Sequence, residues 1–123
     1  MKSILIIEDD HYSRESIKSV LESYDYHIID ASNGQEALDM LSHCNKMPHL
    51  IILDLNMPVM NGTEFREAQL KDQRFAPIPV ILLTGKNTSE ETKDRLKPHQ
   101  FLNKPVDLND LIFVVNNFFL LEH

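Results

Sequence analysis

Short, wholly apolar runs alternate with helical patterns along the chain, and this alternation is the feature that most limits its fold. Runs suited to buried strands lie at Ile4–Ile7, Leu50–Leu53 and Val80–Leu83, with weaker candidates at His27–Ile29 and Phe101–Leu102. Continuous Ile, Leu and Val runs are typical of parallel strands that are buried on both faces. Parallel strands need crossover connections, so these five β–α units predict a parallel sheet covered by helices on both faces.

Helical signals fill the segments between the runs. The first helix is predicted from an apolar face with i, i+3, i+4, i+7 spacing, formed by Ile17, Val20, Leu21 and Tyr24. Later helix starts are predicted from an N-cap with a capping-box glutamate at Asn33–Glu36, from Gly62, from a capping-box pattern at Thr88 and Glu91, and from Asp107. The helix after Thr88 is short and polar, with Leu96 as its large apolar residue.

Composition narrows the class of protein. The chain has 123 residues, enough for one domain, and its net charge of -7 argues against a nucleic-acid-binding surface. No apolar stretch is long enough for a membrane span, and the lone Cys44 cannot form an internal disulfide, so a cytoplasmic location is expected. Residues 121–123 could be the remnant of an expression tag, so functional inference rests on 1–120 as one domain.

Polar side chains follow four of the runs, at the strand ends where ligands bind on sheets of this kind. They are Glu8, Asp9 and Asp10, then Asp54, then Thr84, which precedes Gly85, and finally Lys104, which precedes Pro105. If the first and third strands are neighbours, Asp54 lies close to Glu8 and Asp9. Two carboxylates about 5 Å apart repel by about 3 kcal/mol at an effective dielectric of about 20. A hard cation such as Mg²⁺ would relieve this repulsion, and Lys104 would supply part of the compensation.

Each of these residues also has an ordinary interpretation. Asp10 is expected to be a solvated loop residue or a helix N-cap, and a lone aspartate after a strand is often a turn residue. Thr84 could be a cap, and Lys104 could belong to a surface loop. Their joint placement at the ends of different strands favours the functional interpretation.

Five ordered motifs make the chain similar to the response-regulator receiver domain, the CheY-like module of two-component signalling. They are ILIIEDD at 4–10, ASNGQEAL at 31–38, LDLNMPVMNG at 53–62, VILLTG at 80–85 and FLNKP at 101–105. The resemblance covers essentially the whole chain. It implies a flavodoxin-like, doubly wound (βα)5 three-layer sandwich with strand order 2-1-3-4-5.

The resemblance also implies roles for individual residues. Asp54 would be the phosphoacceptor, and Mg²⁺ would be held by Asp9, Asp54 and the backbone carbonyl of Asn56, with Glu8 acting through water. Lys104 and the hydroxyl of Thr84 would bond phosphoryl oxygens. The switch residues would be Thr84 and Phe101, although Phe101 could instead be an ordinary core aromatic.

The implied partners are a sensor histidine kinase or a histidine phosphotransfer protein, together with an unidentified downstream protein, and neither nucleic acid nor a membrane. The output face would combine the helix within 88–97, the strand at Phe101–Leu102 and the final helix. On this interpretation the chain is a phosphoacceptor signalling domain rather than an enzyme. Gly85 stands where the family usually has alanine, which is expected to loosen the following loop.

Three alternatives stay open at this point. A haloacid-dehalogenase-like phosphatase would also form an aspartyl-phosphate, but it requires an acid two residues after the nucleophile, where this chain has Asn56. A pseudo-receiver would bind its partner without phosphorylation, but such domains usually lose one of the acids, the lysine or the acceptor. The chain could also be a receiver taken from a larger response regulator or hybrid kinase.

Overall fold

A computed structural model describes residues 2–56, 60–85 and 88–122. Within these ranges, five parallel strands form one sheet in the order β2-β1-β3-β4-β5, which confirms the predicted doubly wound α/β architecture. Strands and helices alternate strictly. In chain order they are β1 (Ser3–Ile7), α1 (His11–Glu22), β2 (His27–Ala31), α2 (Gly34–Ser42), β3 (Leu50–Asp54), α3 (Gly62–Lys71), β4 (Val80–Thr84), α4 (Glu90–Leu96), β5 (Gln100–Asn103) and α5 (Leu108–Glu122).

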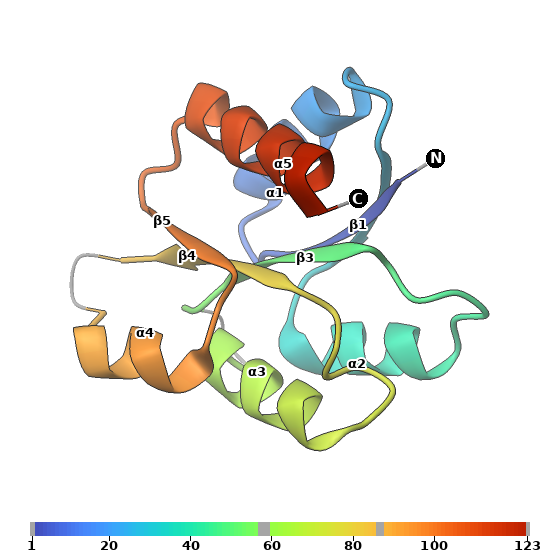
Figure 1. The fold of residues 1–123 in the computed structure, drawn as a ribbon, viewed down its shortest axis with the longest axis vertical. Helices are drawn as coiled ribbons and strands as arrows, with labels where there is room; N and C mark the ends of the chain where they lie inside the picture. Colours follow the sequence, from blue (N-terminus) through green and yellow to red (C-terminus); the bar gives the residue numbers. More distant parts are fainter. Residues whose placement is uncertain (1, 57–59, 86–87, 123) are drawn as a thin grey trace.

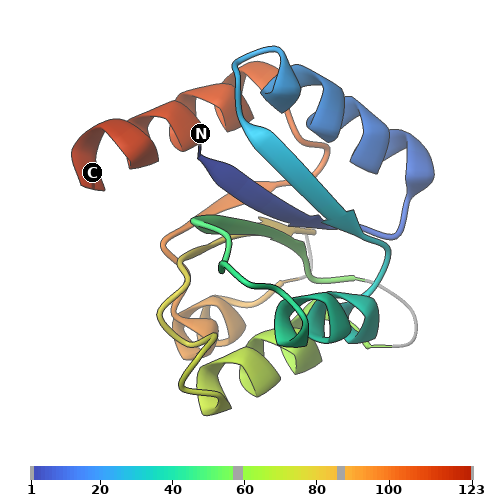
Figure 2. The same cartoon turned by 90° about the vertical axis from the view of Figure 1, so that its right-hand side faces the viewer.

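The helices form two layers around the sheet. Helices α1 and α5 cover one face, and α2, α3 and α4 cover the other (Figures 1 and 2). Successive strand residues point to opposite faces, so the same strand supplies both cores. On β1, for example, Ile4 and Ile6 pack under α1 and α5, whereas Leu5 and Ile7 pack against the other helices. Because both faces are covered, the apolar runs show no alternation with polar residues.

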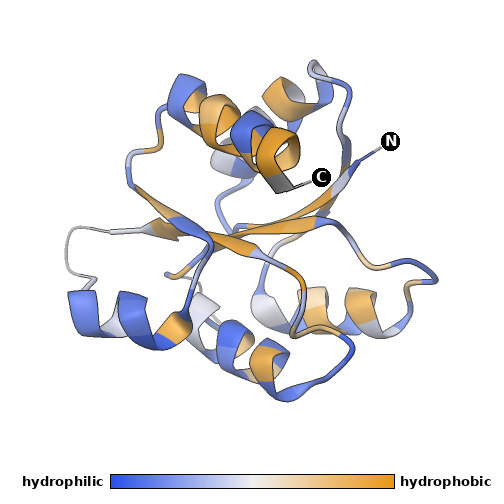
Figure 3. Cartoon of the chain, viewed as in Figure 1, coloured by the Kyte–Doolittle hydropathy of each residue, from blue (hydrophilic) through white to orange (hydrophobic). Residues whose placement is uncertain are grey.

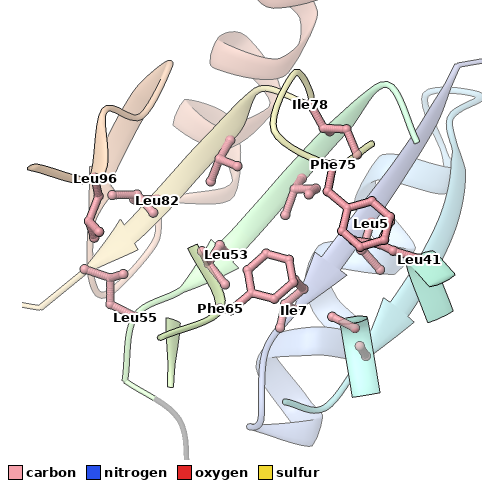
Figure 4. Packing of buried hydrophobic residues seen from close by; sticks show 14 residues of the cluster. Leu5, Ile7, Leu41, Leu53, Leu55, Phe65, Phe75, Ile78, Leu82 and Leu96 are labelled. Atoms are coloured by element: carbon pink, nitrogen blue, oxygen red, sulfur yellow. The ribbon is translucent and has the colours of Figure 1, made fainter. Parts of the chain in front are cut away.

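The core under α2, α3 and α4 is built around Phe65 of α3. This ring is fully buried and lies over the strand residues Ile7 and Leu53 (Figure 4). Helix α4 contributes Leu96, which is also fully buried, and the rest of that helix is largely polar (Figure 3). With a single fully buried apolar side chain among its seven residues, α4 gains little stability from apolar packing.

A buried polar network gives α4 a second attachment. Arg66 of α3 is only 4% exposed, and its guanidinium donates to the backbone carbonyls of Leu96 and Lys97, both at 2.9 Å. It also donates to Oε1 of Gln69 at 2.8 Å, and Gln69 in turn donates to the carbonyls of Phe75 and Ile78. Burial lowers the pKa of Arg66 from its ordinary value. The C-terminal end of α4 is therefore bound to α3 by charge-assisted hydrogen bonds.

Two details of the predicted helices are wrong. Helix α4 begins after Ser89, whose hydroxyl accepts from the backbone N–H of Thr92, so Ser89 is the N-cap rather than Thr88. Helix α1 ends at Glu22, and Tyr24 lies beyond it with half of its surface exposed. Both errors are local, because a cap one residue away, or an extra turn, leaves the apolar pattern almost unchanged.

The other predicted starts are confirmed. Asn33 caps α2 by accepting from the N–H of Glu36, although the Glu36 carboxylate bonds Ser32 rather than the cap residue. Asn61 and Glu64 form a reciprocal capping box at the start of α3. In the described part of the chain, no helix has the length and apolar character needed to cross a bilayer.

Gly62 lets α3 begin directly against the end of β3. A Cβ atom at this position would lie 2.3 Å from the carbonyl oxygen of Asp54 and 2.5 Å from Cα of Leu55. Both neighbours are backbone atoms that cannot rotate away, so any side chain here would push α3 off the strand. The close approach places the start of α3 directly against the backbone of Asp54 and Leu55.

Candidate functional site

The strand register brings the predicted acids together at one edge of the sheet. Ile7 of β1 pairs with Leu53 of β3, so Glu8 and Asp54 are the next residues on neighbouring strands. One carboxylate oxygen each of Glu8, Asp9 and Asp54 can be chosen so that the three lie within 4.8 Å of one another. Glu8 and Asp54 are buried, and Asp9 is exposed at the rim.

The two oxygens of Asp54 have different surroundings. Oδ1 lies 2.7 Å from Nζ of Lys104 and accepts the backbone N–H of Asn56 at 3.1 Å. Oδ2 is buried and has no hydrogen-bond partner among the described residues. Leaving a buried carboxylate oxygen unpaired is costly, so this atom is suited to a ligand that the folded chain does not itself supply.

Within the described part of the chain, Lys104 supplies the positive charge of the site, and its ammonium reaches in from the loop after β5. In addition to Asp54, Nζ lies 3.7 Å from Oε1 of Glu8. Partial burial acts to lower the pKa of Lys104, but the hydrogen bond to Asp54 and the charges of Asp54 and Glu8 outweigh it, so the pKa is raised. One positive charge is thus shared between two buried carboxylates.

The pKa of Glu8 shows that the charge of Lys104 compensates the two buried carboxylates only in part. Burial raises the pKa of Glu8 from 4.5 to about 8, with further contributions from the close approach and the negative charge of the Asp54 carboxylate, whereas Lys104 acts in the opposite direction. Among the described residues, the positive charge of Lys104 does not balance the three carboxylates of the cluster. Converging carboxylate oxygens with one unpaired atom fit a hard divalent cation, which prefers oxygen ligands.

Asp10 takes no part in this cluster. Its carboxylate caps α1 by accepting the N–H of Ser13 at 2.8 Å, and these hydrogen bonds lower the pKa of Asp10. The predicted N-cap role is confirmed.

Thr84 ends β4 and is completely buried. Its hydroxyl is directed at β5, where it lies 3.1 Å from Oδ1 of Asn103 and 3.3 Å from the carbonyl oxygen of Leu102. The sequence did not single out Asn103. A signal was available, because Asn103 directly precedes Lys104 and the parallel register of β4 and β5 places it opposite Thr84.

Phe101 is not an ordinary core residue, because 37% of its surface is exposed. Nζ of Lys93 on α4 lies 4.3 Å from the centre of its ring, within the range of a cation–π contact. The ring therefore lies at the surface between β5 and α4.

A cleft of about 550 Å³ opens beside the acidic residues. It runs between the start of α1 and the loop after β5, and its walls include Asp9, Tyr12, Lys104 and Val106. The rim of the site can therefore be approached from solvent. Of the residues in the LDLNMPVMNG motif, Met57 and Pro58 lie outside the described residues, and Asn56 is exposed next to the site.

The sequence model of the response regulator receiver domain family matches residues 4–116 of the chain. The chain belongs to this family. Membership agrees with the order of the strands and with the acids, threonine and lysine at their ends, and it rules against the dehalogenase-like alternative. Receiver domains generally bind Mg²⁺ at an acidic cluster, and here the cluster is Glu8, Asp9 and Asp54.

Relatives of this receiver domain include regulators and kinases. The chain is 36% identical to the response regulator Rre1 of Synechocystis over 94% of its own length and 50% of that protein. It is 33% identical to the histidine kinase P4 of Formosa agariphila, over 94% of this chain and 8% of the kinase. The chain thus spans about half the length of the first of these relatives and far less of the second.

Solved structures agree with the fold. The chemotaxis protein CheY4 of Vibrio cholerae superposes with a TM-score of 0.84 at 27% identity, covering 95% of this chain and 98% of CheY4. This receiver domain therefore has the CheY-like fold.

Proposed function

We propose that the domain accepts a phosphoryl group on Asp54 from the phosphohistidine of a sensor kinase or a phosphotransfer protein, and then signals to a downstream protein. The observation that supports this proposal most directly is the buried Asp54 carboxylate. Its Oδ1 is held by Lys104, and its Oδ2 has no partner among the described residues and lies next to Glu8 and Asp9. In this role the domain is a phosphoacceptor and does not turn over a separate substrate.

These surroundings support a transfer step in which Asp54 is the nucleophile. A lone pair of Asp54 Oδ2 attacks phosphorus, the phosphorus–nitrogen bond breaks, and its electron pair stays on the donor imidazole. Lys104 holds Oδ1, which orients the carboxylate, and its charge then offsets that of a phosphoryl oxygen. The cleft beside Asp9 and Tyr12 leaves room for the donor side chain.

Asp9, Asp54 and the backbone carbonyl of Asn56 would hold Mg²⁺, with Glu8 acting through water. Bound there, the ion neutralises charge that builds up on the phosphoryl oxygens. The raised pKa of Glu8 supports this assignment, because it shows that a further positive charge would stabilise the ionised carboxylates of the described residues.

The output would leave by α4, β5 and α5. The phosphoryl group would draw the Thr84 hydroxyl toward Asp54, and Phe101 would change its position at the surface. Two exposed aromatic rings on this face, Phe101 and Phe113, support a protein partner there.

Intact-mass analysis after incubation with acetyl phosphate and Mg²⁺ tests the proposal. One phosphoryl group is expected on the unaltered protein and none on Asp54→Asn. Asp10→Asn is the matched control, since asparagine caps a helix as well as aspartate does and this residue lies outside the cluster. Equal labelling of Asp54→Asn would refute the assignment.

A further inference from the structure

The hydroxyl of Thr84 is already engaged before any phosphoryl group is present. Both of its hydrogen-bond acceptors, Oδ1 of Asn103 and the carbonyl oxygen of Leu102, belong to β5. Asp54 ends β3, which lies on the other side of β4. A threonine hydroxyl has one proton to donate, so bonding to β5 and bonding to a group on Asp54 compete.

From this competition we infer that Asn103 is a positioning residue, which holds the Thr84 hydroxyl in the resting state and sets how readily a phosphoryl group on Asp54 captures it. The inference rests on the proposed function and concerns a residue to which that function assigns no role.

Of the two acceptors of the Thr84 hydroxyl, the geometry favours the side chain of Asn103 over the backbone carbonyl of Leu102 as the one that controls the hydroxyl. The Asn103 oxygen is the nearer acceptor, at 3.1 Å against 3.3 Å for the Leu102 carbonyl. The backbones of the two strands are tied together where they end, because the N–H of Lys104 donates to the carbonyl of Thr84 at 2.7 Å. The hydroxyl can therefore change partner by side-chain rotation while the strands stay paired.

The location of Asn103 makes the inference testable. Asn103 is exposed, so its truncation leaves no cavity, whereas Thr84 is buried and requires a replacement of similar shape. Thr84→Val removes the hydroxyl with little change in volume, and Thr84→Ser keeps it.

The experiment is a double-mutant cycle on the affinity for beryllofluoride with Mg²⁺, a phosphoryl mimic, measured by titration calorimetry. Asn103→Ala is expected to bind the mimic about two- to fivefold more tightly, because one neutral hydrogen bond no longer competes for the hydroxyl. The gain should persist in Thr84→Ser and vanish in Thr84→Val. Gln100→Ala, at the exposed start of the same strand, should leave the affinity unchanged. Thermal melts of each variant check that it folds.

Two results would overturn the inference while leaving the proposed function intact: an unchanged affinity in Asn103→Ala, or a gain that persists in the Thr84→Val background. A protein that neither binds beryllofluoride nor takes up phosphate on Asp54 would overturn both.

Discussion

The buried guanidinium of Arg66 allows a quantitative test of what holds α4 in place. Replacing Arg66 by methionine keeps an apolar stem of similar length but removes the donors to Leu96, Lys97 and Gln69. Hydrogen bonds from a charged donor contribute about 1.5–3 kcal/mol each, and an acceptor left buried without a partner costs about 1–3 kcal/mol. The methionine variant recovers part of this lost free energy, because no buried cation has to be desolvated and water can reach the partly exposed Lys97 carbonyl.

The net loss expected for Arg66→Met is about 2–4 kcal/mol in the free energy of unfolding, a large part of the roughly 5–15 kcal/mol typical of a domain. Urea denaturation followed by circular dichroism measures it. Arg66→Lys should lose less, since an ammonium can serve some of the same acceptors. Arg95→Met, on the exposed last turn of α4, is the matched control and should change stability by no more than about 0.5 kcal/mol.

Amide hydrogen exchange measures the local stability of α4 in the same variant. The amides of Glu90–Leu96 should exchange faster in Arg66→Met. Exchange of the amides in the central strands should change only as far as the global free energy of unfolding changes. A loss below about 1 kcal/mol, with α4 protection unchanged, would show that water replaces the guanidinium at little cost and that Leu96 alone anchors the helix.

Three further outcomes are expected. Lys97, the residue that follows α4, has φ 50°, so Lys97→Gly should raise the free energy of unfolding by about 1 kcal/mol in urea, and an unchanged midpoint would count against strain there. Gly62→Ala should lower it by more than about 2 kcal/mol, because the added Cβ meets the backbone of Asp54; near-normal stability would mean that α3 can shift freely. Asp9→Ala should leave the melting temperature measured without Mg²⁺ unchanged or raise it, because the substitution relieves carboxylate repulsion. It should also abolish the rise in melting temperature that Mg²⁺ causes in the unaltered protein. A large drop in melting temperature in metal-free buffer would assign Asp9 a structural role.

Local patterns in the sequence were enough to predict the architecture and the convergence of the three acids at one edge of the sheet. Uniform apolar runs follow from burial on both faces of the sheet, and parallel strands place all their carboxyl ends at one edge. The acids at 8, 9 and 54 were therefore predictable as a group, and the register of β1 and β3 brings them together, with Lys104 reaching Asp54 from the loop after β5. Thr84 ends β4 at the same edge of the sheet, but its hydroxyl bonds β5. Asp10 was predictable as a cap because helix starts carry local signals.

Other features were decided only when distant segments packed together. In the sequence, Arg66 and Gln69 occupy polar positions of a helix, yet they are buried, because the end of α4 and the loop after α3 offer carbonyls that need donors. Phe101 reads as a strand residue, but no helix covers its ring completely, since α4 presents Lys93 there. The hydroxyl of Thr84 finds its partner on Asn103, nineteen positions away. Hydrogen-bond partners and exposure depend on which elements meet in space, and the spacing of residues along the chain does not specify this.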